Sequence, residues 1–137
     1  MDVRNADAGQ SAHMAAVASS YRELKVYRSA FHLQQKLFFL SRDWPREEAY
    51  ALTARLLRSA RSVGADLAQA CTRQPEPEEY RLRLRIAGAE IAETMHWLET
   101  AYDCGYLADA KYAELRDQCE ALRNMLTQAC KQFPLEM

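Results

Sequence analysis

The sequence contains little of the two residues that end helices and form tight turns. Of its 137 residues, 4 are glycine and 4 are proline, whereas 49% are hydrophobic. This composition argues against a turn-rich β protein and favours long helices. The length suits one domain with a single hydrophobic core.

A large net charge and a long apolar run are also missing. The 18 basic and 19 acidic residues leave a net charge of −1, so no global attraction to nucleic acid or to an anionic membrane is expected. No segment is apolar over the length of a membrane span, and the first 20 residues lack the apolar core of a signal peptide. We therefore expect a cytoplasmic protein without a membrane partner, in which the four cysteines are free thiols.

Breaks in the sequence divide the chain into a tail and four helices. Residues 1–18 show no sustained periodicity and are expected to be a disordered tail, after which Ser20 and Glu23 have the spacing of a capping box. The later boundaries are marked by Pro45, by Pro75 and Pro77, and by Gly105. The expected helices cover residues 21–41, 46–72, 78–103 and 108–132 of one domain, 19–137. Because short connections favour antiparallel neighbours, we predict an all-α, antiparallel up-down-up-down four-helix bundle.

The helix expected over residues 78–103 carries two apolar stripes. The stripe suited to the bundle core consists of Tyr80, Leu84, Ala87, Ile91, Leu98 and Tyr102. On nearly the opposite side lie Leu82, Ile86, Ala89 and Trp97, with Glu93 in their middle. A bundle buries only one side of each helix, so the second stripe predicts a subunit contact. Scattered surface hydrophobes are the alternative explanation.

The helix expected over residues 21–41 also has a broad apolar surface. One edge holds Leu24, Tyr27, Phe31 and Phe38, and the other holds Val26, Ala30, Leu33, Leu37 and Leu40. Because this arc is wider than one bundle seam requires, we assign Leu33 and Leu37 to the subunit contact. By contrast, the helix expected over residues 108–132 is apolar on one side only, and Cys119 lies in its stripe as a buried thiol.

The helix expected over residues 46–72 combines a core stripe with a polar reverse face. The core stripe consists of Leu52, Leu56, Ala60, Val63 and Leu67, and the reverse face of Arg55, Arg58, Ser62, Asp66, Gln69 and Arg73. Residues 42–85 contain nine arginines in all, whereas residues 86–137 contain nine acidic residues against four basic ones. The polar face is open to three interpretations: a solvated surface with ion pairs, a polar seam of an assembly, or an anion-binding stripe. In an assembly, Arg58 is the first candidate to pair with Glu93.

One motif has metal-binding character, Glu93-Thr94-Met95-His96. A carboxylate-bridged di-metal site in a bundle needs a second Glu-x-x-His and a glutamate from each remaining helix, and the sequence has no second copy. It also has no Cys-x-x-Cys pair, no glycine-rich phosphate loop and no nucleophile with a base beside it in sequence. We therefore expect no catalytic residue, no metal and no cofactor, and an enzyme is the last of the functions considered.

Four segments carry a resemblance to a known family: Tyr21-Arg22-Glu23-Leu24-Lys25-Val26-Tyr27, Trp44-Pro45-x-Glu47, residues 58–70 and Gly105-Tyr106-Leu107. Their order and spacing over about residues 21–133 resemble the four helix bundle proteins, whose members include proteins encoded in intervening sequences of large-subunit ribosomal RNA genes. The accessory variability protein of diversity-generating retroelements is a more distant, similar relative.

The resemblance implies a left-handed bundle that assembles into a homopentameric ring with a central channel. It also implies nucleic-acid association for the retroelement relatives, which are strongly basic. Within residues 58–70, Gly64 stands where the family has proline, Asp66 where it has asparagine, Gln69 where it has glutamate and Ala70 where it has glycine. Glu93 matches a family glutamate.

Two functions follow from these observations. The first is a non-catalytic, ring-forming homo-oligomer, pentameric by the resemblance, that acts as a structural or adaptor protein and docks a protein partner. The alternative is a nucleic-acid-binding accessory protein. Its expected contacts are Arg55, Arg58, Arg61 and Arg73, which symmetry would repeat around a ring.

Overall fold

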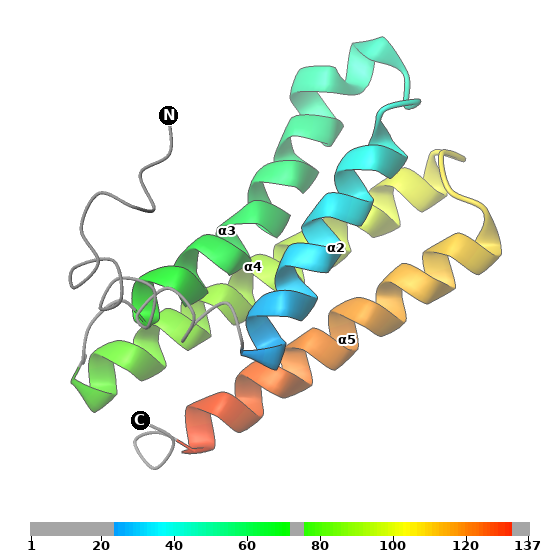
Figure 1. The fold of residues 1–137 in the computed structure, drawn as a ribbon. Coiled ribbons are helices and arrows are strands. Elements are labelled where there is room, and N and C mark those ends of the chain that lie inside the picture. The colour runs from blue at the N-terminus through cyan, green and yellow to red at the C-terminus, as the bar shows by residue number, and fades with distance from the viewer. Residues whose placement is uncertain (1–23, 72–75, 133–137) are drawn as a thin grey trace, which may run out of the picture.

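Four long helices and no strand make up the described part of the chain. The computed structural model describes residues 24–71 and 76–132, so the expected tail, the capping-box residues and Arg73 lie outside it. The helices are α2 (Lys25–Ser41), α3 (Ala54–Ala70), α4 (Pro77–Asp103) and α5 (Asp109–Gln132). They pack side by side along most of their length (Figure 1), as the all-α prediction requires.

The segment before α3 departs from the expected continuous helix over residues 46–72. A 3₁₀ turn, η2 (Arg46–Glu48), is followed by a π-helical turn, η3 (Ala49–Thr53), and regular α-helix begins only at Ala54. Leu52, inside the π turn, is 3% exposed. Sequence periodicity does not distinguish these hydrogen-bond patterns because the 3₁₀ and π turns together cover only residues 46–53, about two turns, which is too short for a period to be recognised.

Both ends of α4 follow from local chemistry. Pro77 occupies the start of the helix, where its missing N–H is not needed, and Glu78 and Glu79 lie near the positive end of the helix dipole. At the other end Gly105 adopts φ +85°, a conformation that favours glycine. The Gly105 N–H donates to the Tyr102 carbonyl at 3.0 Å and the Tyr106 N–H donates to the Ala101 carbonyl at 2.9 Å. This pair of bonds is a Schellman motif, so the predicted glycine cap is confirmed.

The core lies between the four helices and is almost entirely aliphatic. Among the contacts between neighbouring long helices, the α3–α4 contact is the most extensive and the α2–α5 contact the least. Among the described residues, the largest fully buried side chains are Leu37, Leu56, Leu67, Ile91, Leu98, Leu115 and Leu122. The core stripes expected for α3 and α5 are therefore confirmed over the residues that are described.

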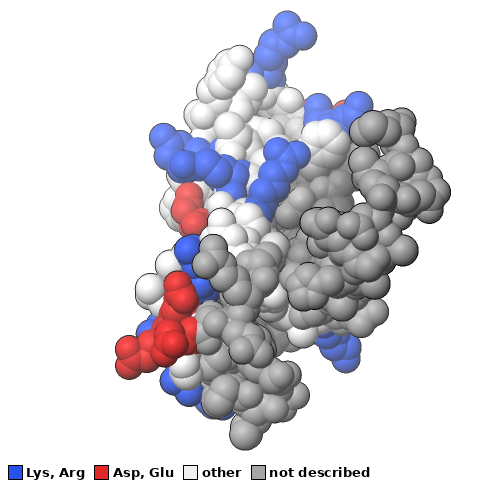
Figure 2. All heavy atoms as spheres, turned by 60° about the vertical axis from the view of Figure 1, so that its left-hand side comes forward, with Lys and Arg blue, Asp and Glu red and all other residues white. Residues whose placement is uncertain are grey.

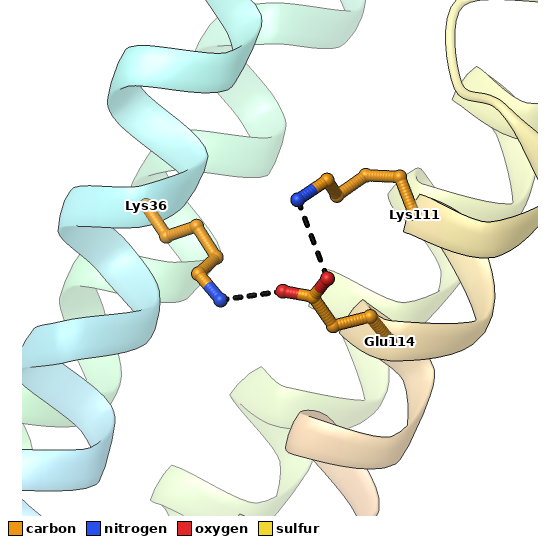
Figure 3. Close-up of polar contacts among 3 residues, drawn as sticks. All are labelled: Lys36, Lys111 and Glu114. Carbon is orange, nitrogen blue, oxygen red and sulfur yellow. Dashed lines mark hydrogen bonds and ion pairs between the residues drawn. The ribbon is translucent and has the colours of Figure 1, made fainter.

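An ion pair joins α2 to α5, the neighbouring helices that pack against each other least. The Lys36 Nζ lies 2.6 Å from Glu114 Oε2, and the Lys111 Nζ lies 3.3 Å from Glu114 Oε1. Figure 3 shows the Glu114 carboxylate held between the two ammonium groups. Their hydrogen bonds lower the pKa of Glu114. Because all three side chains are partly exposed, salt screens this contact.

A second polar link closes one end of the bundle. The Tyr106 hydroxyl donates to Glu48 Oε2 at 2.7 Å, and the Tyr106 ring lies 5.8 Å from the Trp44 ring. The hydrogen bond to the Glu48 carboxylate raises the pKa of Tyr106 to about 12. The connection between α2 and α3 is thus tied to the connection between α4 and α5.

Candidate subunit interface

The predicted second stripe of α4 lies outside the bundle core. We call Leu82, Ile86, Ala89, Glu93 and Trp97 the α4 outer stripe. Leu82 is 52% exposed and Ala89 is exposed, whereas Ile86, Glu93 and Trp97 are half-buried. Trp97 packs against the edge of the core. The stripe runs about four turns along α4 from Leu82 to Trp97. An exposed leucine and half-buried apolar side chains along one helix face are typical of a surface that a second molecule covers.

Glu93 has a partner on its own helix. The Trp97 indole N–H donates to Glu93 Oε2 at 3.0 Å, which fixes the ring against the carboxylate one turn earlier. From α3, the Arg55 guanidinium lies 5.8 Å from the centre of the Trp97 ring, a distance at which a cation is attracted to the ring face. No ion pair joins Glu93 to Arg58 within the described chain. The predicted pairing between these two residues therefore remains a prediction for the assembled protein.

Three carboxylates lie close together where α3 meets α4. Burial raises the pKa of Glu90, the neighbouring Glu93 and Asp66 raise it further, and Arg58 opposes them. Burial also raises the pKa of Asp66, although Arg83 lies 3.8 Å away and lowers it. The arginines therefore compensate Asp66 and Glu90 only in part, and more positive charge from outside the chain would lower the energy of these two carboxylates.

The subunit-contact assignment of Leu33 and Leu37 was wrong about which edge of α2 faces outward. Leu33 is 3% exposed and Leu37 is completely buried, because α2 turns this edge into the core of its own bundle. A side chain without accessible surface has none to offer a second copy.

The opposite edge of α2 is aromatic and open. Phe31 is 46% exposed and Phe39 is 58% exposed, while Phe38 is half-buried. The Arg61 guanidinium of α3 lies 5.5 Å from the centre of the Phe38 ring. We call Phe31, Phe38 and Phe39 the α2 aromatic edge. Sequence reasoning missed Phe39, although it belongs to an apolar run of four residues that is wider than any single helix face.

The arginines predicted as a nucleic-acid stripe point in different directions. Arg55 and Arg58 act on residues of α4, whereas Arg61 lies over an α2 ring. Figure 2 brings the left-hand side of Figure 1 forward. On this side of the bundle, basic side chains lie over the upper part, and acidic side chains lie farther down among other basic ones. This side of the molecule therefore carries both signs of charge.

The Glu93–His96 motif is accounted for by contacts with Trp97. Glu93 accepts the indole hydrogen bond, and the exposed His96 ring lies edge-on to the indole at 4.6 Å. Within residues 24–71 and 76–132, no three His, Cys, Asp or Glu side chains are grouped as metal ligands would be.

Cys119 is fully buried, and burial raises the pKa of its thiol to about 12. The thiolate that reactive cysteines need is therefore not formed near neutral pH. None of the described helices combines the length and apolar character needed to cross a bilayer.

Most of the described chain matches a known protein family. Residues 22–128 match the 23S rRNA-intervening sequence protein family. The chain belongs to this family, which confirms the resemblance seen in the sequence. Comparison with curated proteins gives no match.

A solved structure shares the fold. It is a protein with unknown function from the S23 ribosomal protein family of Bacteroides thetaiotaomicron VPI-5482. The TM-score is 0.70 at 22% sequence identity, and the match covers 77% of this chain and 95% of that one. The likeness shows that the two chains have the same fold.

Proposed function

We propose that this chain is the subunit of a homopentameric ring that serves as a non-catalytic structural or adaptor protein. Each subunit would be a left-handed, up-down-up-down bundle. The observation that carries the proposal is the α4 outer stripe, where Leu82 is 52% exposed and Ile86, one turn farther along, is half-buried. The half-buried Trp97 continues this face about four turns from Leu82. An apolar helix face that the bundle leaves open is the kind of surface that subunits bury.

The location of the exposed apolar groups favours a ring over a simple dimer. The α4 outer stripe and the α2 aromatic edge are unlike surfaces that belong to different helices. Contact between unlike surfaces is heterologous, and a heterologous contact closes into a ring when the rotation between subunits allows it. The choice of five subunits rests on the family resemblance of the sequence, which implies a homopentamer.

The polar groups of the α3–α4 contact fit the same arrangement. Asp66, Glu90 and Glu93 lie together, and Arg58 and Arg83 offset the burial of Asp66 and Glu90 only in part. A neighbouring subunit that brings Arg61 or another cation close to this cluster would complete the pairing. The attraction between the acidic cluster and this cation would fix how the two subunits align, while burial of the apolar stripe would supply most of the stability of the contact.

The mass of the protein in solution tests the ring. Light scattering behind size-exclusion chromatography, or native mass spectrometry, is expected to give five times the 15.7 kDa mass of the chain. Leu82→Glu should shift the protein toward the monomer because the new carboxylate would lose its water in the contact. The matched control is Tyr50→Glu, since Tyr50 is 93% exposed outside both proposed surfaces. A wild-type protein that stays monomeric at high concentration would refute the proposal.

A nucleic-acid-binding accessory protein is the second candidate. Three exposed arginines, Arg55, Arg58 and Arg61, lie on one helix and would be repeated around a ring. Binding through phosphates must weaken steeply as salt rises. A filter-binding or anisotropy titration with generic RNA and DNA at two salt concentrations measures this dependence. No binding at low salt removes the candidate, and equal loss in Arg55→Gln, Arg58→Gln and Arg61→Gln would support it.

A further inference from the structure

A groove follows the contact between α4 and α5 on the outside of the bundle. It consists of two hollows of about 340 and 370 Å³ that share Arg123 as a lining residue. The first hollow lies over Leu84, Gly88 and Leu126, and the second over Ala92 and Met95. This groove does not include the α4 outer stripe, so a molecule bound in it leaves the proposed subunit contact free.

Gly88 is a glycine that the bundle itself does not require. It lies in the middle of α4, its φ is negative, and a Cβ placed on it meets no atom within 4 Å. Glycine in a helix interior costs about 1 kcal/mol relative to alanine. Ala92, one turn farther along, is also small and exposed. Small residues at this spacing allow another backbone to come close to the helix.

The sides of the groove are mostly cationic. Arg85, Arg116, Arg123 and Lys131 line the two hollows, and Glu99 is the one carboxylate in their lining. Arg123 reaches from α5 toward α4, and its Nη1 lies 3.9 Å from the Met95 sulfur. Glu120, 3.8 Å from Arg123, offsets part of its charge. The groove thus has an apolar floor of small and aliphatic residues between positively charged sides.

We propose that the α4–α5 groove binds an acidic, amphipathic helix of a partner protein. The partner would place small or aliphatic side chains on Gly88 and Ala92 and its carboxylates against the Arg and Lys side chains. From Arg85 to Glu99 the groove extends for about 21 Å at the helical rise, which accommodates about four turns. This inference deepens the adaptor part of the proposed function and rests on it, but it does not depend on the ring.

The floor of the groove is what favours a helix over a nucleic acid. A phosphate backbone needs cations but gains nothing from an aliphatic floor or from a missing Cβ. A helix with apolar residues every third or fourth position uses both features. The charge of the groove excludes a basic helix, because each added cation would face Arg85, Arg116, Arg123 or Lys131.

Fluorescence anisotropy with a labelled synthetic helix tests the proposal. The probe is a capped peptide of about 18 residues with leucines at intervals of three and four and glutamates and alanines elsewhere. The full chain should bind it in the micromolar range, and binding should weaken as salt rises. Gly88→Gln and Ala92→Gln should each weaken binding by about tenfold, because their side chains fill the floor. Arg123→Gln should weaken it as well, since Arg123 borders both hollows.

The controls separate the groove from the rest of the molecule. Ala121→Gln introduces the same side chain at an exposed alanine of α5 that lines neither hollow, and it should leave affinity unchanged. A peptide with lysine in place of glutamate should not bind. Three results would each overturn the proposal. The acidic peptide does not bind, the lysine peptide binds equally well, or RNA displaces the acidic peptide and this displacement requires Arg123. Failure of the ring would appear separately, as a monomer mass with groove-dependent peptide binding retained.

Discussion

The hydroxyl groups of Ser59 and Thr94 lie 2.8 Å apart inside the α3–α4 contact, where both residues are buried. Each oxygen is also close to a carbonyl of its own helix: Ser59 Oγ lies 3.0 Å from the Leu56 carbonyl oxygen, and Thr94 Oγ1 lies 2.9 Å from that of Glu90. Two hydroxyl hydrogens therefore serve three contacts. At any moment one hydroxyl donates to a carbonyl, and the other donates either to a carbonyl or across the helix pair.

Removing the two hydroxyls one at a time and together tests this link. Ser59→Ala and Thr94→Val should each lower the free energy of unfolding by about 1 kcal/mol, because a buried oxygen loses a partner. The double variant should cost less than the sum of the two, since no oxygen is then left unpaired. Chemical denaturation at one fixed protein concentration measures all three, and strict additivity would show that the 2.8 Å contact has no energetic role.

Truncation of Leu37 tests the corrected assignment of α2. Leu37→Ala should lower the free energy of unfolding by about 2–5 kcal/mol, because the side chain is fully buried and leaves a cavity. Leu82→Ala, at a side chain that is 52% exposed, should cost under about 1 kcal/mol in the separated subunit. Denaturation of dilute protein, below the concentration at which subunits associate, separates stability from assembly. A cost at Leu37 as small as that at Leu82 would contradict its core position.

The error at Leu33 and Leu37 shows what helical periodicity leaves undecided. Apolar spacing correctly predicted four helices and the core stripes of α3 and α5, because each of those stripes is the broadest apolar face of its helix. In α2 the aliphatic and aromatic edges are equally apolar. Which edge turns inward is decided by neighbouring helices that are far away in the sequence, and aliphatic residues fill the space between four helices with less strain than phenylalanine rings do.

The sequence predicted which face of α4 forms the candidate interface, but it did not predict all of the contacts on that face. The spacing of Leu82, Ile86 and Trp97 predicted one face of α4 away from its core stripe. Leu82 is exposed on this face and the other two are half-buried, while the subunit contact itself stays a prediction. The Glu93–Trp97 hydrogen bond was also within reach of sequence reasoning, since residues four apart on a helix are neighbours. The approach of Arg55 to Trp97 was not, because it depends on how α3 and α4 are rotated against each other.

Two glycines of this chain should respond to alanine in opposite ways. Gly88→Ala should raise the free energy of unfolding by about 0.5–1 kcal/mol, because its φ is negative and the new Cβ meets no atom within 4 Å. Gly105→Ala should lower it by about 1–2 kcal/mol, because φ is +85° in the Schellman motif. Thermal or urea unfolding distinguishes them. Stabilisation at both positions would show that the cap of α4 does not hold this conformation in solution.

Asp66 is a carboxylate in a position that disfavours its charge. Its side chain is 15% exposed, and Oδ2 is shielded from solvent with no hydrogen-bond partner among the described residues. Arg83 approaches only to 3.8 Å, and burial outweighs this attraction, so the pKa of Asp66 lies above the ordinary value of 3.8. The folded chain therefore binds the proton of Asp66 more tightly than the unfolded chain does.

Replacement of Asp66 by the isosteric asparagine should change both the stability and its pH dependence. In the pH window that begins at 3.8 and ends at the raised pKa, the native state holds more protons than the unfolded state, so this group makes stability fall as pH rises. Asp66→Asn removes that contribution and should be more stable than the wild type at neutral pH, with the difference shrinking as pH falls through the window. Urea denaturation at several pH values measures the difference.

Glu114→Gln is the control of opposite sign. The pKa of Glu114 is lowered, so folding stabilises its carboxylate. Removing this carboxylate should therefore lower the free energy of unfolding at pH values above the ordinary pKa of glutamate. If Asp66→Asn is instead less stable at neutral pH, the attraction of Arg83 outweighs burial and the pKa of Asp66 lies below its ordinary value.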